Sequence, residues 1–276
     1  HLNEGHAAFA TLERIRCYQQ KHGLDFWPAL WATRIGNLFT THTPVAAGFD
    51  TYPETLLNQY ATRYAQKLGI SVAELMQLGR ANPNDAGEPF NMAYLAMRTC
   101  GYSNGVSQLH GQVSQQIFQP LFPRWPQREV PVGFVTNGVH MPTWDSPAAD
   151  ELWTNAYGRQ RWRGDLELFN QSDRNTLTDE ALAALANKGR ERLVDYVHRR
   201  LGCQGDTSSD TESKRRLDPA IFTMGFARRF AEYKRPDLLL TDEERLVRLL
   251  NNPERPVQLI IAGKAHPADQ QGKRAL

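Results

Sequence analysis

The sequence predicts an α/β fold in which short buried strands alternate with amphipathic helices. The clearest sign is a strand-helix-strand pattern over residues 219–262, with apolar runs at Ala220–Ala227 and Val257–Ala262 and a helical pattern at Pro236–Leu250 between them. Strands joined in this way are expected to be parallel, because a parallel pair needs such a crossover connection. The first half of the chain also alternates short apolar runs with three-to-four spacing, which is the period of a helix.

Composition narrows the class of protein. With 276 residues, of which 41% are hydrophobic, the chain can bury a large core in one or two domains. Its 32 Lys and Arg against 30 Asp and Glu give no general reason to expect nucleic acid or an acidic membrane as a partner, so anion binding should be local. The apolar runs are much shorter than the ~20 residues of a transmembrane helix, which favours a cytoplasmic protein. Cys17, Cys100 and Cys203 lack a CxxC spacing, so neither a disulfide framework nor a thiolate zinc site is expected.

Helices dominate the pattern before residue 80. Apolar side chains at helical spacing predict a helix at Ala7–Gln20, and the apolar run that ends in Thr-His-Thr predicts a strand at Leu38–Thr43. Further helices are expected at Pro53–Lys67 and Val72–Leu78. The second of these follows Ser71 and has a glutamate as its third residue, a pairing typical of a capping box.

The next segment is punctuated by loops. Asn82–Pro89 is rich in residues that interrupt regular structure, and a strand is predicted after it at Phe90–Met97. A helix is expected at Gly105–Phe118. After several prolines, Val132–Val135 predicts a short strand that leads directly into Thr-Asn-Gly-Val-His at 136–140.

The second half begins with Pro142–Leu201, a mostly helical region, and continues with Asp206–Arg216, a polar and charged loop, before the β-α-β unit. The boundary falls between Asn137 and Pro142, which gives one domain over 1–140 and another over 141–276. Both ends of the chain interrupt a motif or an element, so we expect the chain to be part of a longer polypeptide.

A cluster of cations follows the first strand of the β-α-β unit. Arg228, Arg229, Lys234 and Arg235 lie where the apolar run ends and the predicted helix begins. Backbone N–H groups at a helix start attract anions, and Arg and Lys add charge and hydrogen bonds, so the segment predicts a phosphate site. Gly-Lys-Ala-His at 263–266 follows the second strand and should reach the same sheet edge. The alternative is a solvated basic turn.

Polar motifs also follow strands of the first half. His42 ends the predicted strand at Leu38–Thr43, and Asn137 offers a donor and an acceptor that suit sugar hydroxyls. Each could instead have a structural role, the histidine as a bonded core residue and the asparagine in a turn. His1-Leu-Asn-Glu-Gly-His6 suggests metal ligands, but its HxxxxH spacing does not match a zinc motif. A hydrogen-bonding wall near a pocket is the better interpretation.

Other chemistries are less well supported. Ser103 and His110 could be read as a nucleophile and its base, but the sequence has no G-x-S-x-G elbow there. Ser103 or Asn104 is expected to cap the helix that carries His110. No pair of carboxylates stands out as the acid and nucleophile of a glycosidase.

The motifs together resemble the α-glucan phosphorylases, the glycogen and maltodextrin phosphorylase family. The resemblance spans almost the whole chain and is carried in order by HLNEGH, THTPVAAGFD, NGVSQLHG, TNGVH, RRFAEYKR and IAGKAHP. HLNEGH is similar to the shorter bacterial and archaeal branch. The resemblance implies a GT-B glycosyltransferase architecture of two Rossmann-like domains with the active site between them. The chain would hold the C-terminal part of the first, over 1–140, and the beginning of the second, over 141–276.

The resemblance also implies roles for individual residues. By similarity, His42, Asn137 and Tyr233 would contact the glucosyl unit, and Glu4 and His6 would lie along the pocket wall. The remaining matches concern phosphates: Arg229 and Lys234 would hold the substrate phosphate, and Arg228 would lie near the phosphate of pyridoxal 5'-phosphate. Ala231 stands where the family often has a histidine.

The implied reaction is the reversible phosphorolysis of the terminal α-1,4-linked glucose of a glucan or maltodextrin by inorganic phosphate, which gives α-D-glucose 1-phosphate with retention. Fixed cations would offset the repulsion between the substrate and cofactor phosphates. The family's cofactor lysine lies in a motif like EASGTGNMK, which this chain lacks. We therefore expect that the chain alone neither binds the cofactor covalently nor catalyses the reaction.

Two rival functions are left open by the sequence. A GT-B glucan synthase that uses a nucleotide sugar could share the fold and the basic phosphate site. A non-catalytic carbohydrate-binding fragment could keep the fold without the chemistry. The sequence is compatible with a homo-oligomer but does not determine the oligomeric state.

Overall fold

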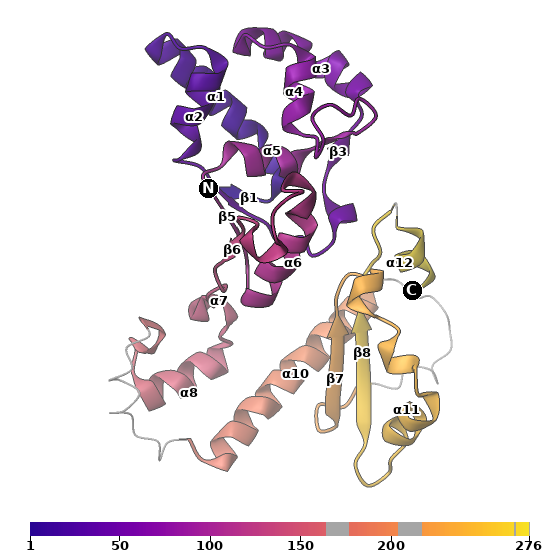
Figure 1. Ribbon diagram of the computed structural model, residues 1–276. Helices are drawn as coiled ribbons and strands as arrows, with labels where there is room; N and C mark the ends of the chain where they lie inside the picture. Colours follow the sequence, from indigo (N-terminus) through magenta and orange to yellow (C-terminus); the bar gives the residue numbers. More distant parts are fainter. Residues whose placement is uncertain (164–176, 204–216, 268, 276) are drawn as a thin grey trace. The chain divides into compact units, whose positions relative to one another are not determined.

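The computed structural model describes residues 1–163, 177–203, 217–267 and 269–275 (Figure 1). The chain divides into two compact units, His1–Gly138 and Val139–Leu276, called unit 1 and unit 2 below. Both contain parallel β-sheet together with helices, so the protein is of the mixed α/β class, as the sequence predicts. The assignment of 1–140 and 141–276 to parts of two Rossmann-like domains stays a prediction.

A small parallel sheet organises unit 1. Its order is β1-β2-β5-β6, and all three strand pairs are parallel. The strands are β1 (Leu2–Asn3), β2 (Leu38–Thr40), β5 (Tyr102–Gly105) and β6 (Gly133–Phe134). Because the strands run the same way, the loops that follow them leave from one edge of the sheet.

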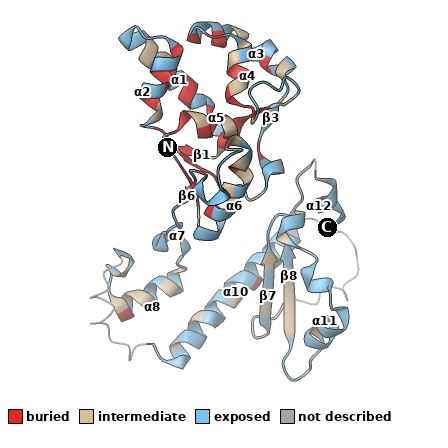
Figure 2. Cartoon of the chain, viewed as in Figure 1, coloured by how far each residue is buried: buried red, intermediate tan, exposed pale blue. Residues whose placement is uncertain are grey.

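Helices pack around this sheet. They are α1 (Phe9–His22), α2 (Phe26–Arg34), α3 (Glu54–Leu68), α4 (Val72–Leu78), α5 (Met92–Thr99) and α6 (Gln108–Phe118), and β3 (Thr51–Tyr52) pairs with β4 (Phe90–Asn91) as a separate antiparallel ribbon. Short 3-10 helices occur at Gly5–Ala7, Ala46–Gly48, Gln119–Leu121 and Gln127–Glu129. The buried apolar side chains of unit 1 form one core, and the elements that contribute to it carry the red segments of Figure 2. Phe39, Phe90 and Phe118 are fully buried in it. Cys100 belongs to this core and Cys17 is exposed.

The helices predicted before residue 80 are confirmed, with their ends shifted by a few residues in α1 and α3. Helix α4 has the predicted bounds, and its capping box is present. The Ser71 hydroxyl accepts from the Glu74 N–H at 3.1 Å, and the Glu74 carboxylate accepts from the Ser71 N–H at 2.8 Å. Both ends of the motif are thus satisfied by local hydrogen bonds.

We expect Ser71→Ala to lower the free energy of unfolding of unit 1 by about 1 kcal/mol, because an N-cap hydrogen bond is lost. Hydrogen bonds from the Ser71 backbone and side chain lower the pKa of Glu74. The stabilisation by the carboxylate is therefore complete above the pKa of an unfolded glutamate and is lost as the pH falls through the lowered pKa. Urea unfolding of Glu74→Gln should show a smaller effect at acid pH than at neutral pH, and equal effects would contradict this.

The strand predicted at Phe90–Met97 is wrong. Only Phe90–Asn91 is extended, and helix α5 begins at Met92. The Asn91 side chain caps this helix by accepting from the Ala93 N–H at 2.9 Å. Helix α5 packs against α1, α2 and α4, and most of its residues are buried. A helix buried on most sides has a nearly continuous apolar sequence, which resembles that of a buried strand.

The capping predicted for the helix at Gly105–Phe118 is also wrong. Ser103 and Asn104 lie in β5, where they pair with Phe39 and Thr40 of β2. Helix α6 begins later, at Gln108, and Ser107 is its N-cap, with the hydroxyl accepting from the His110 N–H at 3.1 Å. Strand β5 is short and polar, so it lacks the alternation that identifies a strand.

Unit 2 contains a helical segment followed by the β-α-β unit (Figure 1). The helices are α7 (Met141–Trp144), α8 (Pro147–Tyr157) and α10 (Asp179–Cys203), with a 3-10 helix at Arg161–Arg163. Strands β7 (Phe222–Ala227) and β8 (Val257–Ala262) are parallel over their whole length, as predicted. The elements after β7 are 3-10 helices at Glu232–Lys234 and Leu238–Leu240, α11 (Glu243–Leu250), which lies against β8, and α12 (Gln270–Arg274). The loop predicted at Asp206–Arg216 lies outside the described residues.

The helix predicted to begin at Pro236 begins instead at Glu243. Its N-cap is Asp242, whose carboxylate accepts from the Arg245 N–H at 3.0 Å. The basic segment includes the 3-10 helix at Glu232–Lys234 and ends at Arg235, which has a positive φ of 48°. The second 3-10 helix, Leu238–Leu240, lies between this segment and the helix start. The idea that a helix N-terminus at Pro236 binds the anion is therefore wrong, and the side chains are left as the source of positive charge. No helix in the described part of the chain is long and apolar enough to cross a membrane.

Candidate functional site

In unit 1 the predicted sugar-binding residues lie at the carboxyl edge of the sheet. Glu4 follows β1, and His42 follows β2 by two residues. Asn137 follows β6, and its N–H donates to the Val106 carbonyl at 3.3 Å, which ties it to the loop after β5. Parallel strands thus bring together residues from distant parts of the sequence.

Glu4 is held in an unusual conformation. Its φ of 74° and ψ of 165° lie in a region that is almost exclusive to glycine and costs about 1–3 kcal/mol. Its Oε1 accepts from the Thr41 hydroxyl at 3.2 Å, from the Thr43 N–H at 2.8 Å and from the His42 N–H. The same residue's Oε2 accepts from the Gly5 N–H at 3.3 Å. The carboxylate is therefore directed at the loop after β2, which we call the histidine loop (Thr41–Thr43).

His42 is exposed, and its ring is held from one side. Its Nε2 lies 2.7 Å from the Oδ1 of Asn3, which is the last residue of β1. An amide oxygen can only accept, so Nε2 carries the proton in this contact. The ring is thus fixed by a neighbouring strand while the rest of it faces solvent.

His110 holds the other side of the histidine loop. Its Nδ1 accepts from the Val106 N–H at 3.1 Å, and its Nε2 lies 3.1 Å from the Thr43 carbonyl, to which it can only donate. Ser103 is buried in β5, and both ring nitrogens of His110 are bonded to backbone groups of other residues. The pair Ser103 and His110 therefore does not form a nucleophile and base.

The remaining residues of the N-terminal motif have mixed roles. His6 is exposed in the 3-10 helix at Gly5–Ala7. His1 Nε2 lies 2.9 Å from the Thr40 hydroxyl, which in turn donates to Asn104 Oδ1 at 3.0 Å. Among the residues that the structure describes, no group of three His, Cys, Asp or Glu side chains is arranged to hold a metal ion.

In unit 2 the basic segment begins directly after β7. Arg228 and Arg229 are exposed, while Phe230 is buried and anchors the segment. The Phe230 N–H donates to the Lys264 carbonyl at 3.0 Å, and Phe230 forms a parallel bridge with Ala265. The loops after β7 and β8 therefore run side by side, as the sequence predicts.

Glycine is required where these loops meet. A Cβ on Gly263 would clash with the Arg228 carbonyl and the Phe230 ring, so the two backbones approach too closely for any side chain there. Asp269 caps α12 by accepting from the Gly272 N–H at 2.8 Å.

The cations of this segment have no ion pair with an acid among the residues that the structure describes. Lys234 is half-buried, and its Nζ lies 5.5 Å from the ring centre of Tyr233, within the range of a cation–π contact. In the described parts of the chain, neither Arg228, Arg229 nor Lys234 forms an ion pair with a carboxylate. Their charge is thus available to an anion.

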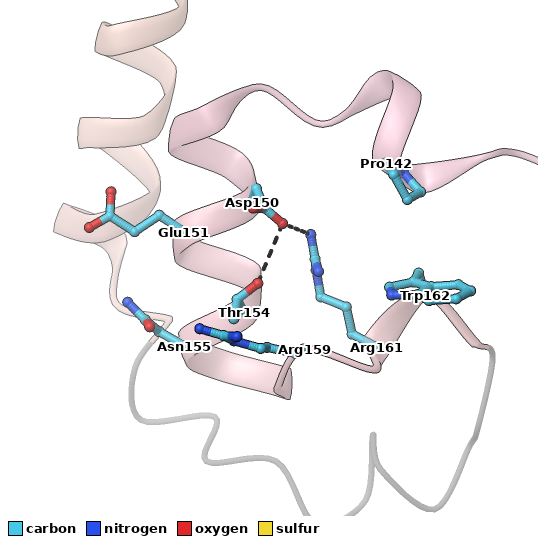
Figure 3. A pocket seen from close by; sticks show the side chains of 8 residues that line it. All are labelled: Pro142, Asp150, Glu151, Thr154, Asn155, Arg159, Arg161 and Trp162. Carbon is cyan, nitrogen blue, oxygen red and sulfur yellow. Dashed lines mark hydrogen bonds and ion pairs between the residues drawn. The ribbon is translucent and has the colours of Figure 1, made fainter.

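A different pocket of about 510 Å³ lies in unit 2 (Figure 3). Among its lining residues, Arg161 forms ion pairs with Asp145 and, at 2.7 Å, with Asp150. The lining residues are Pro142, Asp150, Glu151, Thr154, Asn155, Arg159, Arg161 and Trp162. None of the residues predicted to bind sugar or phosphate lines it.

Two residues of the site were not predicted from the sequence. His110 contacts the histidine loop, and Phe230 anchors the basic segment. Asn3 belongs to the motif predicted as a hydrogen-bonding wall, and it contacts the His42 ring. Their only sequence signal is position, since each lies within or beside a motif that resembles the phosphorylases. Which atoms they contact depends on strand pairing between distant segments.

The chain is similar to known proteins over its whole length. The family model for carbohydrate phosphorylase matches residues 1–276. The chain is 39% identical to the maltodextrin phosphorylase of Thermococcus litoralis, with 100% of this chain and 32% of the relative covered. It is 38% identical to the glycogen phosphorylase of Mycobacterium tuberculosis (99% and 32% covered) and 36% identical to that of Aquifex aeolicus (100% and 40% covered).

The chain thus spans between 32% and 40% of the length of these relatives. The match covers both units and all the motifs of the two sheet edges. The chain belongs to the carbohydrate phosphorylase family.

Proposed function

We propose that the full-length protein is an α-glucan phosphorylase. It would cleave the terminal α-1,4-linked glucose of glycogen or maltodextrin with inorganic phosphate and release α-D-glucose 1-phosphate, reversibly. The observation that carries this proposal is the basic segment after β7, where Arg228, Arg229 and Lys234 have no carboxylate partner among the described residues. The names of the relatives, maltodextrin and glycogen phosphorylase, support it.

The proposed architecture is GT-B, with each unit forming part of one Rossmann-like domain. Two parallel sheets support it, one in each unit, with the predicted ligand residues after the carboxyl ends of their strands. Ligands of open α/β sheets bind at that edge. Unit 1 would thus contribute sugar contacts, and unit 2 would contribute the phosphate contacts and the Tyr233 phenol.

The proposed roles of the sugar-binding residues follow from the chemistry of their side chains. His42 and Asn137 would bind hydroxyls of the glucosyl unit, together with the Tyr233 phenol, and Glu4 and His6 would shape the surrounding wall. These groups would orient the sugar before reaction. Their side chains include both hydrogen-bond donors and acceptors.

Phosphate would be held by Arg229 and Lys234. A guanidinium binds two phosphate oxygens at once, whereas an ammonium is a point charge that can follow the phosphate as charge shifts. Both would stabilise negative charge that develops on the phosphate and on the oxygen of the departing glucan. Ala231, which replaces the frequent histidine of the family, leaves the spacing of these cations unchanged.

The described residues fit the phosphate end of pyridoxal 5'-phosphate, because Arg228 adds an exposed guanidinium without an acid partner beside the substrate cations. When bound, that cofactor would supply a second phosphate group to the site. The motif that carries the family's cofactor lysine does not occur in this chain. We therefore expect catalysis from the full-length protein and not from this chain alone.

The test is a donor comparison with the full-length protein. We expect phosphate-dependent release of glucose 1-phosphate from maltodextrin and no turnover of nucleoside diphosphate glucose. Transfer from the nucleotide sugar without phosphorolysis would favour a GT-B glucan synthase. Maltodextrin binding without either reaction would favour a carbohydrate-binding protein.

A further inference from the structure

The histidine loop (Thr41–Thr43) leaves the sheet between the ends of two neighbouring strands. β2 lies between β1 and β5 in the sheet, so the loop is flanked by the residues that follow β1 on one side and by those that follow β5 on the other. Both flanks make hydrogen bonds to it. The N–H groups of His42 and Thr43 and the Thr43 carbonyl are thereby bonded within the protein itself.

The first flank is Glu4. Its carboxylate accepts the backbone N–H groups of both His42 and Thr43 and the hydroxyl of Thr41. Three donors saturate Oε1, and the fourth bond, from the Gly5 N–H, goes to Oε2. A carboxylate used in this way fixes the loop and has little capacity left for a substrate hydroxyl. Its positive φ indicates that the surrounding structure imposes this orientation.

The second flank is His110 at the first turn of α6. Its ring joins two loops, because Nδ1 accepts from the Val106 N–H and Nε2 donates to the Thr43 carbonyl. Thr43 is thus held through both its N–H, by Glu4, and its carbonyl, by His110. The two peptide groups that flank the Thr43 Cα are each held by one hydrogen bond, which restricts their rotation and that of the His42 backbone before them.

The third contact acts on the side chain of His42 itself. Asn3 Oδ1 accepts from Nε2 at 2.7 Å, which keeps the proton on Nε2 and leaves Nδ1 with a lone pair. A lone pair on Nδ1 suits a hydroxyl donor. In a neutral ring the choice of tautomer decides whether the histidine accepts or donates at that position.

We propose that Asn3, Glu4 and His110 are positioning residues that fix His42 with Nδ1 as a hydrogen-bond acceptor for a sugar hydroxyl. The identity of that partner rests on the proposed function, whereas the fixed loop and tautomer do not. Glu4 thus acts as a clamp that holds the histidine loop, and not only as a residue of the pocket wall. Asn3 and His110 are then also part of the site.

The tautomer can be measured by nitrogen NMR on the 276-residue chain labelled with 15N-histidine, with the His42 signals assigned from a His42→Gln variant. We expect wild-type His42 to be the Nε2–H tautomer in its neutral form. Asn3→Ala should give a mixture of tautomers, and Asn3→Asp, which keeps an acceptor oxygen, should restore the single form. A wild-type Nδ1–H tautomer, or no change in Asn3→Ala, would overturn the proposal.

The clamp can be measured by amide hydrogen exchange of the same chain. Loss of the charge-assisted bonds in Glu4→Ala should speed exchange of the His42 and Thr43 amides by about tenfold or more. Glu4→Gly, which relieves the positive φ but also lacks the carboxylate, should show the same increase. Glu129→Ala removes an exposed carboxylate elsewhere in unit 1 and serves as the matched control. Unchanged exchange in either Glu4 variant would refute the clamp.

An activity measurement separates this proposal from the proposed function. In the full-length protein, Asn3→Ala should lower kcat/KM for maltodextrin, and Asn3→Asp should recover most of it under conditions in which the His42 ring is neutral, because imidazolium has no acceptor nitrogen. If the NMR results hold and the wild-type protein has no phosphorylase activity, the proposed function fails and the positioning role stands. If activity is present and both Asn3 variants retain it in full, the positioning role fails.

Discussion

Replacing Lys234 by alanine in the full-length protein should lower kcat/KM for phosphorolysis by about 10²–10³-fold, the usual loss when one preorganised charge-stabilising donor is removed. The Lys234 side chain is half-buried beside Tyr233, and no carboxylate in the described chain competes for its charge. Removing it would leave the negative charge of the phosphate less well balanced. The loss should appear mainly in the kinetics with respect to phosphate, measured as kcat and KM at varied phosphate concentration.

The matched control for this prediction is Arg255→Ala. Arg255 lies just before β8, at the amino end of the two-stranded sheet, whereas Lys234 follows its carboxyl end. The control removes one positive charge from the same unit and should leave kcat/KM within about twofold of wild type, as expected for an exposed surface change. Equal losses in both variants would show that net charge, not the site, is responsible. An unaffected Lys234→Ala enzyme would remove this lysine from phosphate binding.

Local sequence signals predicted the elements whose ends are determined locally. Helix α4 has the predicted bounds because Ser71 and Glu74 supply both hydrogen bonds of its cap. The parallel pairing of β7 and β8 followed from the apolar runs and the crossover between them. In such segments, propensity, capping and periodicity agree with the tertiary structure.

Other features depended on distant contacts. Helix α5 was taken for a strand because its burial against three other helices makes its sequence apolar on most sides. Strand β5 was missed because pairing with β2, rather than its own residues, makes it a strand. The positive φ of Glu4 had no sequence signal at all, since an L-residue rarely adopts it. The site motifs were thus predictable as segments, but the partners of their atoms were not.

The second large effect is expected from a substitution of Phe118, in the core that supports β2. Phe118, at the end of α6, is fully buried and contacts three aromatic rings: Phe49, stacked at 5.4 Å between ring centres, and Phe39 and Tyr94, edge-on at 6.2 and 6.3 Å. We expect Phe118→Ala to lower the free energy of unfolding of unit 1 by about 3–5 kcal/mol, because apolar burial is lost and a cavity remains.

Urea unfolding followed by a signal from unit 1 would measure this loss, with Tyr60→Ala as the control. Tyr60 is 73% exposed on α3, so its removal should change the free energy of unfolding by no more than about 0.5 kcal/mol. A Phe118→Ala loss as small as that of Tyr60→Ala would show that the surrounding rings close the cavity. Because Phe39 precedes the histidine loop by two residues and packs on Phe118, the variant should also speed amide exchange at His42. Stability of the core and order in the histidine loop would then decrease together, as expected when a rigid sheet positions the loop.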